Sequence, residues 1–267
     1  MLRTRIITAA VLAALLFAVV LWLPQIATVI VLTLIVLTGA WEWSAFLRAR
    51  MTAWRLLYVI AVAALLALGW QFTASPLGRA LLLSAAVLWW IIAALWVVFA
   101  PRRAARWSAA LAGLFALVPA WVALMRLRLD LPRGTQWMLF VLILVWVADI
   151  GAFFVGRRFG RMRLAPEVSP GKTWEGVLGG IAASAIVAVA GSEWFGISWL
   201  EFVPLCLAAV AFSVVGDLTE SLLKRFAGVK DSGSLFPGHG GVMDRIDSVT
   251  GAAPVLLFGL LALGVAT

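Results

Sequence analysis

Long apolar runs alternate with short polar loops along the whole chain. Because a helix of roughly 17–25 apolar residues is long enough to cross a bilayer, these runs predict about nine transmembrane helices. We expect them at about 6–23, 25–46, 55–72, 78–100, 106–125, 136–155, 175–195, 198–216 and 248–266. The predicted fold class is therefore all-α, a polytopic integral membrane protein.

Composition supports this prediction and excludes an ordinary soluble domain. Hydrophobic residues occupy 64% of the 267 positions and charged residues only 12%, whereas a soluble domain is about 45–50% apolar. A second apolar run follows the first almost at once, which predicts an uncleaved first helix rather than a signal peptide. The single cysteine, Cys206, lies inside an apolar run, so no disulfide framework is expected.

The net charge of +9 is explained by topology rather than by a nucleic-acid partner. Cytoplasmic loops of membrane proteins are enriched in Lys and Arg. A cytoplasmic N-terminus places most of the basic residues inside, namely Arg3, Arg5, Arg48, Arg50, Arg55, Arg102, Arg103, Arg106, Arg157, Arg158, Arg161, Arg163, Lys172, Lys224, Arg225, Lys230 and Arg245. The loop that holds Arg126, Arg128 and Arg133 runs against the rule.

The chain is predicted to be a single transmembrane domain, 1–267, whose acidic residues are concentrated in the second half. Residues 1–135 hold only Glu42 and Asp130 as acids, so this part is interpreted as mainly scaffold helices. Residues 136–267 are interpreted as catalytic helices with cytoplasmic loops 156–174 and 217–247. For Glu42 we favour an acid that extends to the membrane interface, and the alternative is an acid that lines a polar cavity.

The first polar loop carries several basic residues and leads into the N-terminus of the next predicted helix. Asp149 lies near the inner end of its span, where a carboxylate facing lipid would be costly, so it should face the bundle interior. Its role is either a structural ion pair or part of a site. Ser169, Lys172, Thr173 and Glu175 lie at the start of the next span and suit an anion cradle at a helix N-terminus, and simple capping by Thr173 would explain part of this pattern. The four arginines of this loop are interpreted as anchors for acidic lipid.

The second polar loop carries two pairs of acids with helical spacing. Asp217 and Glu220 are three residues apart and share one helix face, and Asp244 and Asp247 repeat that spacing. Four acids at the ends of adjacent helices would repel one another, so a cation is the natural compensator. Oxygen-only ligands favour Mg²⁺ or Mn²⁺ over Zn²⁺.

Glycines between these pairs suit a phosphate site. In Pro237-Gly238-His239-Gly240-Gly241 the backbone can approach a phosphate without interference from a Cβ atom. Lys224, Arg225, Lys230 and Arg245 could hold the anion. His239 either makes a hydrogen bond within the loop, contacts a phosphate or transfers a proton.

This region resembles the signature of the phosphatidate cytidylyltransferase, or CDP-diacylglycerol synthase, family. The matching positions are Ser221, Lys224, Arg225, Lys230, Asp231, Gly233, Pro237, His239, Gly240, Gly241, Asp244, Arg245 and Asp247. Residues 148–180 look like a second conserved region of that family. Gly171 departs from the family pattern, in which Lys is more frequent.

The resemblance implies transfer of CMP from CTP to phosphatidic acid, giving CDP-diacylglycerol and pyrophosphate for phospholipid synthesis. It implies Mg²⁺, with Mn²⁺ or a second cation as alternatives, at Asp217 and Asp244 with support from Glu220, Asp247 and Asp149. The implied catalytic residues are Asp244, Asp217, Lys230, Lys172 and Arg245. The implied substrate-binding residues are Ser169, Lys172, Lys224, Arg225, Lys230, His239, Gly240, Gly241 and Arg245. A homodimer in the cell inner membrane, with its active site facing the cytoplasm, is also implied.

Other functions fit the sequence less well. A cytidylyltransferase or CTP-using kinase that acts on another lipid is the first alternative. A transporter would place charged residues along a path near mid-membrane, whereas the acids here are predicted at the cytoplasmic helix ends. A purely structural anchor would not need acids beside lysine and glycine loops.

Overall fold

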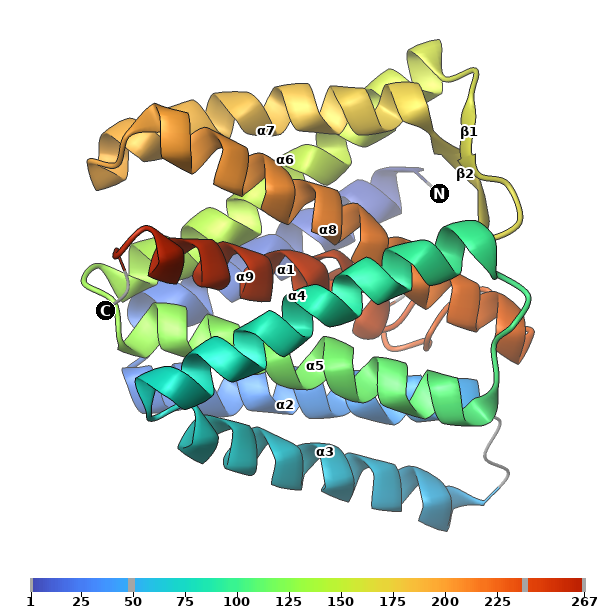
Figure 1. Cartoon of the computed structure of the whole chain (residues 1–267). Helices are drawn as coiled ribbons and strands as arrows, with labels where there is room; N and C mark the ends of the chain where they lie inside the picture. The colour runs from blue at the N-terminus through green and yellow to red at the C-terminus, as the bar shows by residue number, and fades with distance from the viewer. Residues whose placement is uncertain (1, 48–50, 237–239, 266–267) are drawn as a thin grey trace.

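The computed structural model describes residues 2–47, 51–236 and 240–265, with side chains from residue 10 onward. These residues form a helical bundle with one small hairpin (Figure 1). The elements are α1 (Leu2–Trp22), α2 (Gln25–Trp43), the 3₁₀ helix η1 (Ser44–Leu47), α3 (Thr52–Phe72), α4 (Pro76–Phe99), α5 (Arg106–Leu129), α6 (Gly134–Phe159), β1 (Arg163–Ala165), β2 (Ser169–Thr173), α7 (Trp174–Phe195), α8 (Trp199–Ala227) and α9 (Met243–Ala262).

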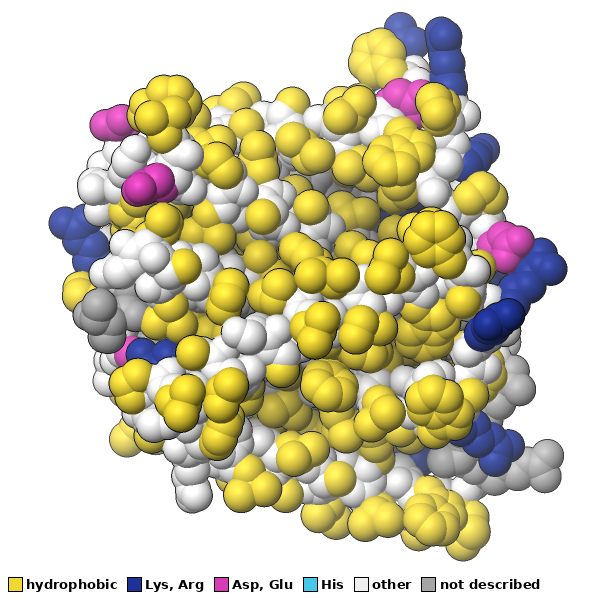
Figure 2. All heavy atoms as spheres, in the orientation of Figure 1, with side chains coloured by type: hydrophobic (Ala, Val, Ile, Leu, Met, Phe, Trp, Pro, Cys, Tyr) yellow, Lys and Arg dark blue, Asp and Glu magenta, His cyan; other side chains and the backbone are white. Residues whose placement is uncertain are grey.

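The predicted all-α membrane fold is confirmed. Within the described residues, eight helices, α2 to α9, are long and apolar enough to cross a membrane. The ninth expected span forms α1, whose described apolar part, Ala10–Trp22, is shorter. Figure 2 shows apolar side chains covering the broad face of the bundle, whereas Lys and Arg gather mostly at the end where the hairpin lies. The cytoplasmic N-terminus stays a prediction.

Helices α5 and α9 form the centre of the bundle and are the most buried of the spans. Helix α9 packs closely on α8 because glycines remove side chains from the contact. A Cβ atom at Gly216 would lie 2.5 Å from the Asp247 carbonyl oxygen, and one at Gly251 would collide with the Phe212 carbonyl oxygen. Small residues at helix crossings allow such close approach of backbones. The same contact brings the acids of α8 and α9 together.

Helix α8 is longer than predicted and includes much of the expected loop 217–247. The spacing of buried Leu218, Leu222 and Leu223 continues its apolar face beyond residue 216. The helix ends where Gly228 adopts a left-handed conformation with φ of 75°. Helix α9 begins at Met243, so the connecting loop is 228–242 and both acid pairs lie on helices.

The other polar loop, 156–174, contains the antiparallel strands β1 and β2, which the sequence did not predict. The Thr173 side chain accepts a hydrogen bond of 3.2 Å from the Gly176 N–H and so caps α7. Glu175 accepts hydrogen bonds from the N–H groups of Arg161 and Met162. These contacts fix the hairpin against the first turn of α7.

Arg126, which was predicted on the outer side against the positive-inside rule, has its charge neutralised inside the bundle. Arg126 lies within α5, and only 6% of its surface is exposed. Its guanidinium donates to the Trp70 carbonyl at 2.7 Å and lies 3.1 Å from Asp130 Oδ2. Arg79 lies 3.4 Å from the same Asp130 oxygen. Arg126 therefore ties α3 to α5 rather than forming part of an exposed outer loop.

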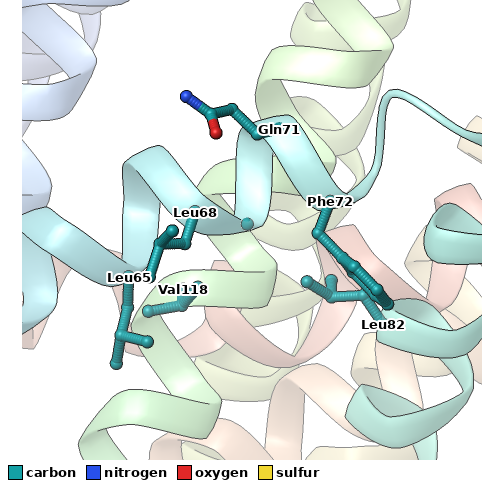
Figure 3. Close-up of a pocket in the computed structure, with 7 residues that line it drawn as sticks. Leu65, Leu68, Gln71, Phe72, Leu82 and Val118 are labelled. Carbon is teal, nitrogen blue, oxygen red and sulfur yellow. The ribbon is translucent and has the colours of Figure 1, made fainter.

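An apolar groove of about 480 Å³ lies beside this cluster, between α3, α4 and α5 (Figure 3). Leu65, Leu68, Phe72, Leu82 and Val118 supply most of its wall. Its lining holds no charged side chain. Val118 lies near the middle of α5, and the groove offers none of the charged groups that phosphate chemistry requires.

Candidate active site

Three polar side chains of α8 form one face of that helix. Asp217, Glu220 and Lys224 are spaced at i, i+3 and i+7, so their side chains follow one another along the same face of the helix. The Lys224 Nζ atom lies 2.6 Å from Glu220 Oε2 and 2.6 Å from Asp244 Oδ1 on α9. One ammonium group therefore compensates two carboxylates and joins α8 to α9.

The described parts of loop 228–242, residues 228–236 and 240–242, contact the carboxylate of Asp244 through Ser232 and Gly241. Asp244 Oδ2 accepts hydrogen bonds from Ser232 N at 2.9 Å, Ser232 Oγ at 2.7 Å and Gly241 N at 2.8 Å. Gly240 has φ of 78°, and a Cβ atom there would lie 2.5 Å from Asp244 Oδ2. The glycines thus allow the loop to approach Asp244, and the Gly241 N–H is used in that contact. Phosphate binding by Gly240 and Gly241 stays a prediction.

A second group of acids joins three helices. Asp149 on α6, Asp217 on α8 and Asp247 on α9 interact electrostatically with one another. Asp149 also accepts a hydrogen bond from the Ser248 side chain and interacts with Lys172 and Arg245. Asp149 faces α8 and α9 as predicted, but it is exposed rather than buried. Asp149 and Asp217 therefore keep exposed surface, whereas Asp247 is buried behind the helix contacts.

The hairpin brings Lys172 to this surface. Lys172 Nζ lies 2.5 Å from Asp217 Oδ2, and both side chains are about a quarter exposed, at 28% and 26%. Arg225 Nε donates to the Val168 carbonyl at 3.3 Å, which attaches the turn of the hairpin to α8. The predicted anion cradle and the predicted acid cluster are therefore neighbours in space.

The donor chemistry of the acid cluster fits a hard divalent cation. Glu220 is fully buried, and among the described residues its Oε1 atom has no hydrogen-bond donor. Its carboxyl group lies within hydrogen-bonding range of Asp247. Two facing carboxyl groups favour a cation or a proton between them, and oxygen-only ligands suit Mg²⁺. In the part of the chain that the structure describes, no three acids converge into a ready ligand set, and Lys172 and Lys224 contact the carboxylates.

The remaining predicted residues lie around this cluster. Ser169 begins β2, Lys230 is exposed on the loop, and Arg225 and Arg245 are exposed on α8 and α9. Their assignment to individual phosphates stays a prediction. His239 lies outside the described residues.

The sequence interpretation of Glu42 was wrong. Glu42 does not extend to the membrane interface, because its side chain is buried beneath loop 228–242, with 6% of its surface exposed. Its Oε2 atom accepts a hydrogen bond from Met243 N at 2.8 Å and lies 3.3 Å from Ser232 Oγ. The only sequence signal was an acid between two tryptophans within an apolar run. Ser232, which links Glu42 to Asp244, was not predicted either.

Comparison with known proteins supports the family resemblance seen in the sequence. The model of the Cytidylyltransferase family matches residues 3–263. The chain belongs to this family. A phosphatidate cytidylyltransferase of Haemophilus influenzae is 41% identical over 95% of this chain and 96% of its own length. The enzyme of that name from Pseudomonas aeruginosa is 42% identical, over 99% of this chain and 98% of its own length.

A more distant cytidylyltransferase matches only part of the chain. The phosphatidate cytidylyltransferase of Bacillus subtilis is 41% identical over 49% of this chain. The longer matches extend through scaffold and site helices alike, so the chain shares a whole-length architecture with those members. The resemblance noted in the sequence is confirmed at the level of the family.

Proposed function

We propose that this chain transfers CMP from CTP to phosphatidic acid, giving CDP-diacylglycerol and pyrophosphate for phospholipid synthesis. Two relatives with this activity in their names match it over nearly their full length. Two contacts carry the proposal: Lys172 pairs with Asp217, and Lys224 pairs with Asp244. They join cations and acids of three separate segments, with Lys172 and Asp217 partly exposed and Lys224 and Asp244 largely buried.

The proposed reaction is an in-line substitution at phosphorus. A phosphate oxygen of phosphatidic acid forms a bond to the α-phosphorus of CTP, and the bond from that phosphorus to the bridging oxygen breaks. Pyrophosphate leaves with the electron pair. Such transfers depend mainly on positioning and on charge stabilisation. Phosphatidic acid is already ionised near neutral pH, so no side chain is required as a general base.

The cations of the site bring two polyanions together. Lys172 and Arg245 border the accessible acids Asp217 and Asp149, and we assign them to the phosphates of CTP and of the lipid. Lys230 and Arg225 are exposed close by on the loop and on α8. Compensation of phosphate charge by Lys and Arg lowers the repulsion that opposes attack.

We propose that the activity requires Mg²⁺, which Mn²⁺ could replace. Asp217 and Asp244 would hold the ion, and Glu220, Asp247 and Asp149 would support it or hold a second one. Bound Mg²⁺ supplies neutralisation of charge on the phosphate oxygens. The loop donors described above all reach Asp244 Oδ2, which leaves Oδ1, now beside Lys224, as the oxygen directed toward the other acids.

The proposed location is the bacterial inner membrane with the site facing the cytoplasm, where CTP is found. The apolar spans and the bacterial relatives support the membrane assignment. The cytoplasmic orientation is supported by the basic residues around the site. The homodimer is a proposal that rests on the family resemblance, and the lack of a nucleic-acid partner is a proposal that rests on the placement of the basic residues in loops between spans.

The proposal is tested by conversion of radiolabelled CTP to a lipid-extractable product by the purified full-length protein. Product should require both phosphatidic acid and Mg²⁺, and it should be lost in Asp244→Ala. Glu193→Ala removes an exposed acid at the far end of α7 and should leave the rate unchanged. Product from a different lipid phosphate, but none from phosphatidic acid, would move the assignment to that lipid.

A further inference from the structure

We propose that Glu42 is a positioning residue of the active site, through which scaffold helix α2 fixes the placement of Asp244. The proposal rests on the proposed function, because it concerns the same site. Glu42 does not contact the accessible acids itself. It acts through Ser232, through two glycines of loop 228–242 and through the first residue of α9.

Glu42 holds the start of α9. Its Oε2 atom accepts the Met243 N–H at 2.8 Å, across a separation of 201 residues in the sequence. The first N–H groups of a helix have no partner within the helix, and a carboxylate there also interacts favourably with the helix dipole. Met243 immediately precedes Asp244, so the Glu42 carboxylate sets the position of the turn that carries Asp244.

Ser232 couples the two carboxylates. Its Oγ atom lies 2.7 Å from Asp244 Oδ2 and 3.3 Å from Glu42 Oε2. The hydroxyl has one proton to donate, and the shorter distance assigns that proton to Asp244. The Asp244 N–H donates back to Ser232 Oγ at 3.3 Å. Ser232 therefore packs against Glu42 Oε2 without donating to it and is hydrogen-bonded to Asp244, so a movement of Glu42 would shift Ser232 and, through it, Asp244.

Two glycines of the loop pack directly on Glu42. A Cβ atom at Gly241 would lie 2.5 Å from the Glu42 Cδ atom, and one at Gly233 would lie 2.8 Å from it, with a closer approach to Oε1. Gly233 is not among the glycines with positive φ. Its backbone is therefore compatible with alanine, and the Glu42 carboxylate is what excludes a side chain there. The loop is built around this buried acid.

Loss of this support should act on the chemical step. A displacement of about 1 Å at a catalytic group can cost on the order of 100-fold in rate. We expect Glu42→Ala to lower kcat by about 10- to 100-fold, with a much smaller change in KM for CTP. Glu42→Gln keeps an acceptor oxygen for Met243 N and should retain most of the activity.

The decisive experiment is a double-mutant cycle in the full-length protein with Gly233→Ala. The added methyl group should displace Glu42 and lower kcat to a similar extent as Glu42→Ala. The double variant Glu42→Ala/Gly233→Ala removes the clash, so its loss should not exceed that of Glu42→Ala alone. Ala188, buried on α7, a helix that packs mainly on α6 and α8, offers Ala188→Gly as a control for generic destabilisation.

Each outcome decides the proposal. A smaller loss in the double variant than the product of the single losses, with rescue in Glu42→Gln, supports it. Multiplicative losses, full activity in Glu42→Ala, or a Glu42→Gln variant as impaired as Glu42→Ala would overturn it. If Glu42→Ala does not fold, Glu42→Asp with Gly233→Ala gives the same comparison. Asp244→Ala is measured in parallel: an active Asp244→Ala would refute the proposed site, whereas an inactive one beside a normal Glu42→Ala refutes only the role of Glu42.

Discussion

Lys224 Nζ contacts Asp244 Oδ1 and Glu220 Oε2 at the same distance, 2.6 Å, so one ammonium group bridges helices α8 and α9. The lysine is 13% exposed, and the acids are 8% and 0% exposed. In this setting the lysine is a structural counter-charge as well as a candidate phosphate ligand. The sequence suggested only the second role.

Lys224→Met should therefore destabilise the protein as well as inactivate it. Removing one partner of a buried ion pair leaves an uncompensated charge and costs roughly 3–5 kcal/mol. Thermal unfolding in detergent should show a clearly lower midpoint. Lys230→Met, at an exposed loop lysine, is the matched control and should leave the midpoint unchanged. Equal midpoints for both variants would contradict a structural role for Lys224.

Lys172 and Asp217 should behave in the opposite way. Their ion pair is partly exposed, at 28% and 26%, and a pair of this kind contributes about 0–1 kcal/mol to stability. We expect Lys172→Met and Asp217→Asn to unfold near the wild-type temperature but to lose at least about 100-fold in kcat/KM, consistent with loss of an electrostatic contact to the reacting phosphates. Initial rates over a range of CTP concentrations, together with melting curves, test this. Arg103→Met, at an exposed basic residue away from the cluster, is the control.

Divalent cation should stabilise the protein in the absence of substrates. A ligand that binds only the folded state adds about 2.7 kcal/mol at a concentration 100 times its dissociation constant. The unfolding temperature should rise with added Mg²⁺ and fall back with EDTA. The rise should be lost in an Asp217→Asn/Asp244→Asn double variant. A rise of the same size with NaCl at matched ionic strength would indicate screening rather than a bound ion.

The arginine cluster at the far end of the bundle should affect stability alone. Arg126→Met removes the guanidinium that Trp70, Thr73 and Asp130 share, and it leaves Asp130 with Arg79 only. Because Asp130 is partly exposed and keeps Arg79, we expect a destabilisation of roughly 1.5–3 kcal/mol, the contribution of hydrogen bonds to a charged group. The kcat of the folded fraction should stay at the wild-type value. A variant with a normal melting curve but a reduced kcat would instead connect this cluster to the reaction.

Part of the site could be predicted from the sequence alone. The spacing of Asp217 and Glu220, and that of Asp244 and Asp247, is a helical spacing, so each pair shares a face wherever the helices lie. The apolar runs likewise fix the helices, because a backbone inside lipid must satisfy its own hydrogen bonds. The family signature added the chemistry expected at these acids. These inferences need only local geometry.

Other features depended on which segments meet in space. Glu42 was misread because its partners, Ser232 and Met243, lie far away in the sequence. Phosphate approach at Gly240 and Gly241 stays a prediction, but the sequence did not indicate that Gly233 and Gly241 make room for Glu42 and that Gly240 makes room for Asp244. A glycine shows that space is needed but not for which group.

The sequence by itself determined the membrane-spanning helices, the family and the residues that carry charge at one end of the bundle. Only the tertiary structure decided that Lys224 neutralises Glu220 and Asp244, that the hairpin brings Lys172 to Asp217, and that α2 belongs to the site through Glu42. The physical reason is the separation along the sequence over which each interaction acts. Helix formation and side-chain periodicity are set by neighbours within a few residues, whereas charge compensation and packing are set by whichever helices the fold places side by side.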